Sequence, residues 1–117
     1  MTKLGFYLKS GPYASSRGET MYHLARAAIE KGIQVSLFLD LDGVMHPIET
    51  QRSVEVLDVP KIRINDLLER GARVYVCGTC LNARGLFDPD ALKDGIISGN
   101  MEDLASIFGE VDRLVSL

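Results

Sequence analysis

The chain has 117 residues, of which 46% are hydrophobic and 25% are charged, and its formal net charge is −3. This size and composition are typical of one globular domain, which we expect to span residues 1–117. The sequence holds no long run of basic residues for a nucleic-acid surface, and every apolar run is far shorter than the ~20 residues of a membrane-spanning helix. We therefore expect that the protein binds neither nucleic acid nor a membrane. Two cysteines and an N-terminus without the pattern of an export signal predict a cytoplasmic protein.

The first half of the chain alternates between strand and helix patterns. Residues 4–8 form a short apolar run that ends at a Ser-Gly-Pro turn. Apolar residues then recur at helical spacing from Met21 to Ile29, and Lys31 followed by Gly32 is a typical helix end. Residues 33–39 are a second expected strand.

The second half continues the alternation. A helix over residues 64–68 ends at Gly71, and a third strand follows over residues 72–77. We expect a short helix after Cys80 that stops at Gly85, then a weak fourth strand over residues 95–98. Asn100 caps the last helix, with Asp103 placed as in a capping box, before a fifth strand over residues 113–117. The expected buried face of this helix consists of Met101, Leu104, Ala105 and Phe108.

Strands separated by single helices predict a single-domain, doubly wound α/β fold. Its sheet should be parallel and five-stranded, in the order 2-1-3-4-5, with helices on both faces. Residues 40–59 show no sustained period, so this stretch is a lid, an interface segment or a set of missed short elements. Within it, the apolar stretch Val54–Val59 is our candidate for a subunit interface.

Cys77-Gly78-Thr79-Cys80 is the most specific local feature, because it lies where a strand ends and a helix begins. Backbone N–H groups at such a position stabilise a thiolate, and ligands bind at this edge of open α/β sheets. The alternative interpretation is a pair of small buried residues under a tight turn. We take Cys77 and Cys80 as candidate catalytic residues.

In the order 2-1-3-4-5, the loop after the first strand would lie directly beside Cys77. Its small residues, hydroxyl groups and following helix make it a candidate cradle for an anion, although a plain Gly/Pro/Ser connection has the same composition. Together with positions near the cysteines, the candidate substrate-binding residues are Gly11, Tyr13, Ser15, Ser16, Arg17, Asp42, Gly78, Thr79 and Arg84.

Three other interpretations fit poorly. Residues 38–44 resemble the first motif of haloacid-dehalogenase phosphatases, but a complete strand–helix unit precedes them and the later acidic pair has no good counterpart. The thioredoxin fold needs a proline opposite its dithiol, and Pro89 follows Cys80 too closely. His23 and His46 do not pair with the cysteines at zinc-site spacing, so we expect no metal and no cofactor.

Taken together, the segments resemble the DsrE/DsrF-like sulfur-relay family, which includes the TusD-type sulfur carriers. The resemblance runs through most of the chain, at residues 11–18, 37–38, 42–44, 67–77, 77–85 and 101–104. It implies a compact five-stranded parallel α/β fold and assembly as a trimer or hexamer. It also implies a persulfide on Cys77, with sulfur-donor and sulfur-acceptor proteins as partners.

The resemblance leaves several roles open. Cys80 would either resolve a persulfide as a disulfide or simply pack. Arg84 would hold the anionic sulfur or solvate a helix end, and Asp42 would orient a partner loop or cap the turn after the second strand. Two other functions remain as alternatives: a dithiol redox protein that uses Cys77 and Cys80, and a non-catalytic oligomeric module that binds a small anion or nucleotide.

Overall fold

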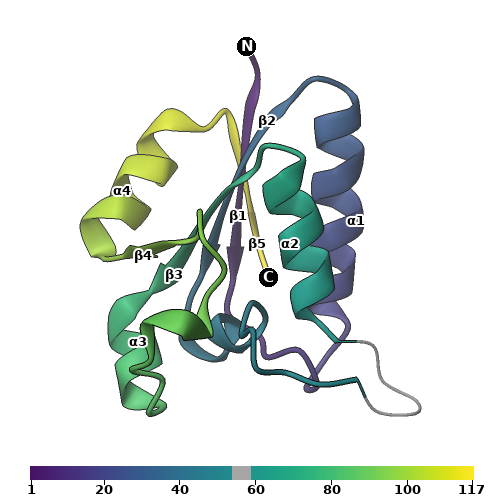
Figure 1. The fold of residues 1–117 in the computed structure, drawn as a ribbon. Coiled ribbons are helices and arrows are strands. Elements are labelled where there is room, and N and C mark those ends of the chain that lie inside the picture. The colour runs from purple at the N-terminus through teal and green to yellow at the C-terminus, as the bar shows by residue number, and fades with distance from the viewer. Residues whose placement is uncertain (54–58) are drawn as a thin grey trace.

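Five parallel strands form one sheet in the computed structural model, which describes residues 1–53 and 59–117 (Figure 1). The strands are β1 (Lys3–Leu8), β2 (Gln34–Leu39), β3 (Arg73–Cys77), β4 (Ile97–Gly99) and β5 (Arg113–Ser116). The α-helices are α1 (Arg17–Glu30), α2 (Lys61–Glu69), α3 (Gly78–Ala83) and α4 (Met101–Glu110), and two short 3₁₀ helices are η1 (Leu41–Met45) and η2 (Pro89–Ala91). The predicted single α/β domain with a parallel five-stranded sheet is confirmed.

The strand order is 4-3-2-1-5, so the expected order 2-1-3-4-5 is wrong. That order would place β2 at an edge of the sheet, yet the last five residues of β2 are all buried. A strand that is apolar on both faces is stable only in the interior of a sheet with covered faces. The edge position expected for β2 falls instead to β4, of which two of the three residues are exposed.

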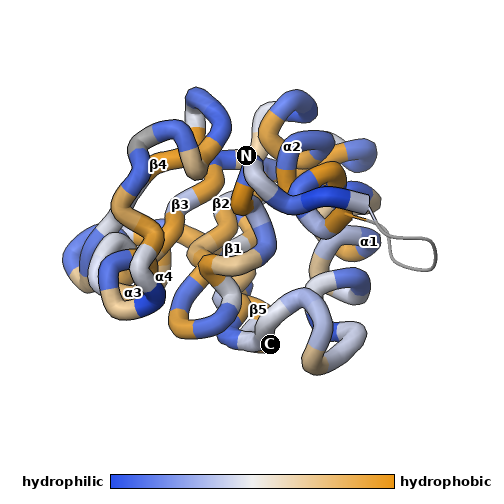
Figure 2. Tube along the Cα trace, turned by 60° about the horizontal axis from the view of Figure 1, so that its bottom comes forward, coloured by the Kyte–Doolittle hydropathy of each residue, from blue (hydrophilic) through white to orange (hydrophobic). Residues whose placement is uncertain are grey.

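This order determines which helices cover each face. The chain steps in one direction from β1 to β4, so right-handed crossovers place α1 and α2 on one face of the sheet. The step from β4 back to β5 runs in the opposite direction and places α4 on the other face (Figure 1). In Figure 2 the central strands are coloured mainly hydrophobic, whereas the helices alternate between hydrophobic and hydrophilic residues. This pattern is expected when the core lies between the sheet and the helices that cover it.

Most expected helix ends are confirmed, but two details differ. Asn100 and Asp103 form the predicted capping box of α4, yet this helix buries Leu104 and Ile107, while Met101 and Phe108 remain exposed. Ala105 of the expected face is exposed too, so helix α4 is rotated relative to that face, and the half-covered Phe108 ring lies edge-on to Tyr7 at a centroid distance of 5.9 Å. Helix α3 begins at Gly78 and so includes Cys80, which was expected to precede it.

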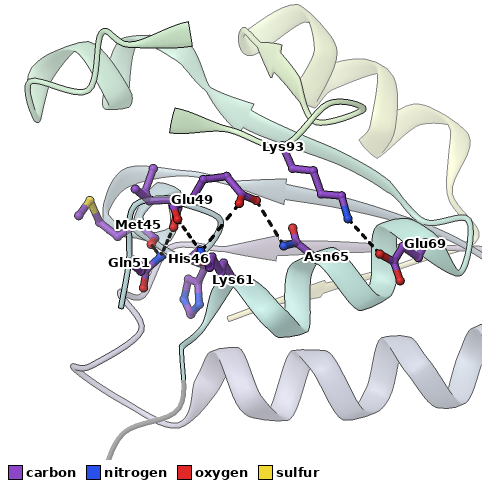
Figure 3. Close-up of polar contacts among 9 residues, drawn as sticks. Met45, His46, Glu49, Gln51, Lys61, Asn65, Glu69 and Lys93 are labelled. Carbon is purple, nitrogen blue, oxygen red and sulfur yellow. Dashed lines mark hydrogen bonds and ion pairs between the residues drawn. The ribbon is translucent and has the colours of Figure 1, made fainter. Parts of the chain in front are cut away.

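The irregular stretch after β2 contains η1 and is then tied down by polar contacts (Figure 3). The side-chain amide of Gln51 donates to the carbonyl groups of Met45, His46 and Ile48 at 2.8–3.1 Å. Lys61 of α2 donates to the carbonyl oxygen of Glu49 at 2.5 Å. The expected interface stretch, residues 54–59, lies outside the described residues except for its last position. In the described part of the chain, no helix is long and apolar enough to cross a membrane.

Candidate functional site

The two cysteines lie at the carboxyl end of β3, where the strand turns directly into α3. Cys77 is the N-cap of α3, and its Sγ accepts a hydrogen bond from the backbone N–H of Cys80 at 3.3 Å. Both are free thiols and both are buried. Because Cys80 belongs to the first turn of α3, its side chain comes back toward the end of the neighbouring strand β2.

Asp40 occupies that neighbouring strand end and is the centre of a buried polar network. Its carboxylate accepts hydrogen bonds from the hydroxyl of Tyr7 at 2.5 Å, the backbone N–H of Leu41 at 2.9 Å and the thiol of Cys80 at 3.0 Å. Tyr7 comes from β1, so three adjacent strands contribute to one cluster. Asp40 is only 6% exposed, and these donors satisfy a carboxylate that would otherwise be costly to bury.

Leu41 has an unusual backbone conformation for a bulky residue. Its φ angle is +50°, and it is the sole non-glycine residue with positive φ in the described part of the chain. Left-handed backbone of this kind costs roughly 1–2 kcal/mol for an L-residue. It places the N–H of Leu41 toward both the Asp40 carboxylate and the Cys80 Sγ, at 2.9 and 3.3 Å. Such strain is typical of a functional site.

The network also shifts the pKa values of its members. Burial raises the pKa of Asp40, but the hydrogen bonds from Tyr7, Cys80 and the Leu41 N–H outweigh it and hold this pKa below its usual range. Burial, together with contacts to Cys77 and Asp40, raises the pKa of Cys80 to about 12. Burial and the bond to Asp40 raise the pKa of Tyr7 to about 12 as well. At neutral pH, therefore, Asp40 is a carboxylate and Cys80 is a thiol.

A cavity of about 670 Å³ opens in front of the cysteines. One wall comes from β2, η1, β3 and α3, and the other from the beginning of α4. The lining residues are Asp40, Leu41, Cys77, Thr79, Cys80, Asn100, Met101 and Glu102. Leu41 and Met101 are 50% and 55% exposed, so the mouth of the cavity is partly apolar.

Asp40, Cys77 and Cys80 are also the nearest approach to a metal site among the described residues. Their donor atoms all lie within 4.8 Å of one another. Structural zinc sites take four protein ligands, and no fourth His, Cys, Asp or Glu joins this group in the described part of the chain. The Cys80 thiol instead donates a hydrogen bond to Asp40, so the arrangement fits a hydrogen-bonded thiol–carboxylate pair better than a metal centre.

The loop after β1 does not lie beside Cys77, and this expected placement is wrong. Strand β2 and η1 intervene, because β2 pairs with both β1 and β3. Gly11 and Tyr13 line a separate, smaller cavity of about 290 Å³, whose wall also includes Asp42. The buried ring of His46 fixes this loop to η1 through a 2.9 Å contact between its Nε2 and the carbonyl oxygen of Ser10.

The remaining candidate residues fall into three places. Arg84 pairs with Asp42 at 2.6 Å and also donates to the carbonyl oxygen of Cys80 at 3.0 Å, so this ion pair connects α3 to η1 beside the cysteine cavity. Gly78 packs against β4, where an added Cβ would lie 2.9 Å from the Ser98 hydroxyl oxygen. Ser15, Ser16 and Arg17 are exposed at the start of α1, away from the cavity lining.

Three site residues were missed in the sequence: Asp40, Tyr7 and Leu41. The available signal was Asp40 itself, a carboxylate directly after an apolar strand. Parallel strand ends meet at one edge, so Asp40 would have been expected near Cys77 had β2 been placed next to β3. In their place, Asp42 was the acidic candidate, either orienting a partner loop or capping the turn, whereas Asp40 caps the turn by accepting from the Leu41 N–H.

Comparisons with known proteins identify the family of the chain. The chain is 32% identical over 114 residues to an uncharacterized protein of Methanocaldococcus jannaschii, covering 97% of this chain and 98% of the relative. It is 24% identical over 117 residues to a TusC homolog of Aliivibrio fischeri, with 98% of each chain covered. The crystal structure of the YchN protein from E. coli superposes with a TM-score of 0.89 at 26% identity and covers both chains fully. The family model of the DsrE/DsrF-like family matches residues 2–117, and the chain belongs to this family.

Proposed function

We propose that this protein is a cytoplasmic sulfur carrier that accepts sulfane sulfur as a persulfide on Cys77. The observation that carries the proposal is the position of Cys77, at the carboxyl end of β3 and on the wall of an open cavity of about 670 Å³. Its neighbour Cys80 has a raised pKa and donates a hydrogen bond to Asp40 while it keeps its proton. Of the two thiols, Cys77 is therefore the one that we assign as the nucleophile.

The chemistry requires one reactive sulfur and a donor. The Cys77 thiolate attacks the terminal sulfur of a donor persulfide, R–S–SH. A bond forms between Cys77 Sγ and that sulfur, the S–S bond of the donor breaks, and the donor leaves as the thiolate R–S⁻, which takes up a proton. Cys77 then carries –S–SH. The N–H of Cys80, which already donates to Cys77 Sγ at 3.3 Å, supports negative charge on the attacking sulfur.

Family membership and the similarity to a TusC homolog support a role in sulfur relay. A relay needs donor and acceptor proteins, and the partly apolar cavity mouth formed by Leu41 and Met101 is a suitable surface for them. We assign three residues to substrate positioning: Thr79, which lines the cavity, and the ion pair of Arg84 and Asp42 beside it. We also propose that the protein works as a homo-oligomer.

Mass spectrometry of the protein after incubation with glutathione persulfide tests this function. The wild type and the matched control Cys80→Ser should each gain one reductant-labile sulfur on the peptide that contains residue 77, and Cys77→Ser should gain none there. Equal sulfur uptake by Cys77→Ser would overturn the assignment. An internal disulfide without retained sulfur would favour a dithiol redox protein, and an unreactive pair of thiols would favour a binding module.

A further inference from the structure

Cys80 is held as a hydrogen-bond donor by a carboxylate that cannot move freely. The Sγ of Cys80 lies 3.0 Å from Asp40 Oδ1, and the same oxygen accepts from the Leu41 N–H. The other oxygen, Oδ2, accepts from the Tyr7 hydroxyl at 2.5 Å. Asp40 is therefore fixed from two sides, by β1 and by the strained backbone of Leu41, in the position where it faces the thiol.

The proton of this pair stays on sulfur. A lowered pKa makes Asp40 a very weak base, and a pKa of about 12 makes Cys80 a very weak acid. Proton transfer from Cys80 to Asp40 is consequently far uphill. Asp40 does not activate Cys80 as a nucleophile. Its negative charge, facing the sulfur in a buried site, opposes the formation of a second negative charge there.

The other charged groups near Cys80 do not cancel the effect of the Asp40 charge on the Cys80 thiol. Cys77 lies on the β3 side, and Glu102 of α4 lines the same cavity as a further anion. Two cations lie nearby: Lys9 sits over the Tyr7 ring and donates to the Ser116 hydroxyl, and Arg84, the C-cap of α3, pairs with Asp42 and donates to the backbone carbonyl oxygen of Cys80. Arg84 also attracts negative charge on the two cysteine sulfurs, but burial and the contacts to Cys77 and Asp40 outweigh this attraction, since the pKa of Cys80 is raised.

We propose that Asp40 is a positioning residue that keeps Cys80 protonated and thereby protects a persulfide on Cys77 from being resolved by its neighbour. This proposal deepens the proposed function and rests on it, since the protected group is the Cys77 persulfide. It assigns Cys80 a defined resting state, in place of the open choice between resolving and packing. It also gives a reason for the cluster of Tyr7, Asp40 and Leu41 around a cysteine that does not itself carry sulfur.

The reaction that Asp40 suppresses is intramolecular resolution. The Cys80 thiolate would attack Sγ of the Cys77 persulfide, forming a Cys77–Cys80 disulfide and breaking the bond to the terminal sulfur, which leaves as hydrosulfide. The donor atoms of the two cysteines lie within 4.8 Å, so geometry alone offers little protection. Both cysteine sulfurs are oxidised to the disulfide level and the sulfane sulfur is reduced to sulfide, so no external oxidant is needed.

The size of the protection follows from the thiolate population. A rise in pKa from 9.0 to about 12 leaves ~1,000-fold less Cys80 thiolate at neutral pH. A thiolate of higher pKa is more nucleophilic, by ~20-fold over this range. The net protection is then ~50-fold. Burial is the largest cause of the raised pKa and would remain without Asp40, so we expect removal of the Asp40 charge alone to accelerate resolution about tenfold.

The first test measures Cys80 without any persulfide. In a Cys77→Ser background, the rate of Cys80 alkylation by iodoacetamide is followed against pH. Asp40→Asn should shift this profile to lower pH, because an amide N–H in place of the carboxylate stabilises the thiolate. Asp40→Ser, which keeps a side chain that can cap η1, should shift it in the same direction and serves if the asparagine variant does not fold. Asp66→Asn is the matched control, since Asp66 also accepts from a tyrosine hydroxyl, at 2.7 Å, but lies on α2.

The second test uses the chain with both cysteines, loaded with glutathione persulfide. Asp40→Asn should release sulfide about tenfold faster than wild type, and adding Cys80→Ser to that variant should abolish the acceleration. An unchanged alkylation profile in both Asp40 variants, or faster release that persists without Cys80, would overturn the proposal. If Cys77 takes up no sulfur in any variant while the alkylation profile still shifts, the proposed function fails, and with it the protective role, but the effect of Asp40 on Cys80 stands.

Discussion

Gly43→Ala should disturb both the stability of the fold and the cysteine site. Gly43 lies in η1, and a Cβ added there would come within 3.1 Å of the Leu8 carbonyl carbon and closer still to its oxygen. Both are backbone atoms at the end of a central strand, so no side chain can rotate away. Ordinary contacts between carbon atoms are ~3.5–4.0 Å, so η1 must move outward by on the order of 1 Å. Overpacking of this kind costs about 2 kcal/mol, which lowers Tm by ~8 °C for a domain of this size.

The same displacement should reach Asp40. The Leu8 carbonyl accepts from the Asp40 N–H at 2.9 Å, and the Asp40 carbonyl accepts from the Gly43 N–H at 2.8 Å. Moving η1 therefore weakens the position of Asp40 against Cys80, and Cys80 alkylation in a Cys77→Ser background should become faster. Gly109→Ala is the matched control, because nothing lies within 4 Å of a Cβ at that helical position, and it should raise Tm slightly. A Gly43→Ala protein with the Tm of wild type would refute this account of η1.

Three further predictions concern the loop after β1 and the ion pair beside the site. Burial lowers the pKa of His46 below 6.5, so as the pH falls the unfolded chain takes up a proton on this residue before the folded chain does. The free energy of unfolding should therefore fall as the pH drops below about 6.5. His46→Gln should flatten this pH dependence, whereas substitution of the exposed His23 by Gln should not. An added Cβ at Gly18 would lie 3.1 Å from His46 Nδ1, so Gly18→Ala should cost ~1–3 kcal/mol in chemical denaturation despite the higher helix propensity of alanine. Because the side chain of Asp42 is 69% exposed in its pair with Arg84, Arg84→Gln should change the free energy of unfolding by less than ~1 kcal/mol in the same assay, and a larger loss would show that the pair acts as a buried one.

Sequence periodicity was sufficient for the elements and the fold class, because each depends on local pattern. The glycines at 32, 71 and 85 lie just past helix ends, with φ angles of +81°, +100° and +74°. Residues other than glycine rarely adopt such backbone angles. The capping box of Asn100 and Asp103 was readable for the same reason. The buried face of α4 could not be predicted in this way, since it depends on how the helix packs against β1, which is distant in the sequence.

Strand order depends on long-range pairing, and the local sequence patterns were compatible with both the order 2-1-3-4-5 and the observed order 4-3-2-1-5. The decisive feature was the continuous burial along β2, from Val35 to Leu39. Its apolar residues are interrupted by Ser36, which is buried too and accepts a hydrogen bond from Arg73 of β3. A polar residue in that position suggests an exposed face when only the sequence is considered, and the partner that satisfies it comes from the neighbouring strand.

The error in strand order and the failure to find Asp40 have one cause. Adjacent strands lie ~4.8 Å apart, so in the order 2-1-3 the ends of β2 and β3 would be separated by roughly 10 Å, with β1 between them. A 3.0 Å bond from Cys80 to Asp40 is incompatible with that separation. With β2 between β1 and β3, consecutive strand ends bring Tyr7, Asp40 and Cys77 to one edge, and each strand contributes one polar group. The hydrogen bond that fixes the state of Cys80 is therefore a direct consequence of the topology, and the loop after β1 is displaced from the cysteines by the same arrangement.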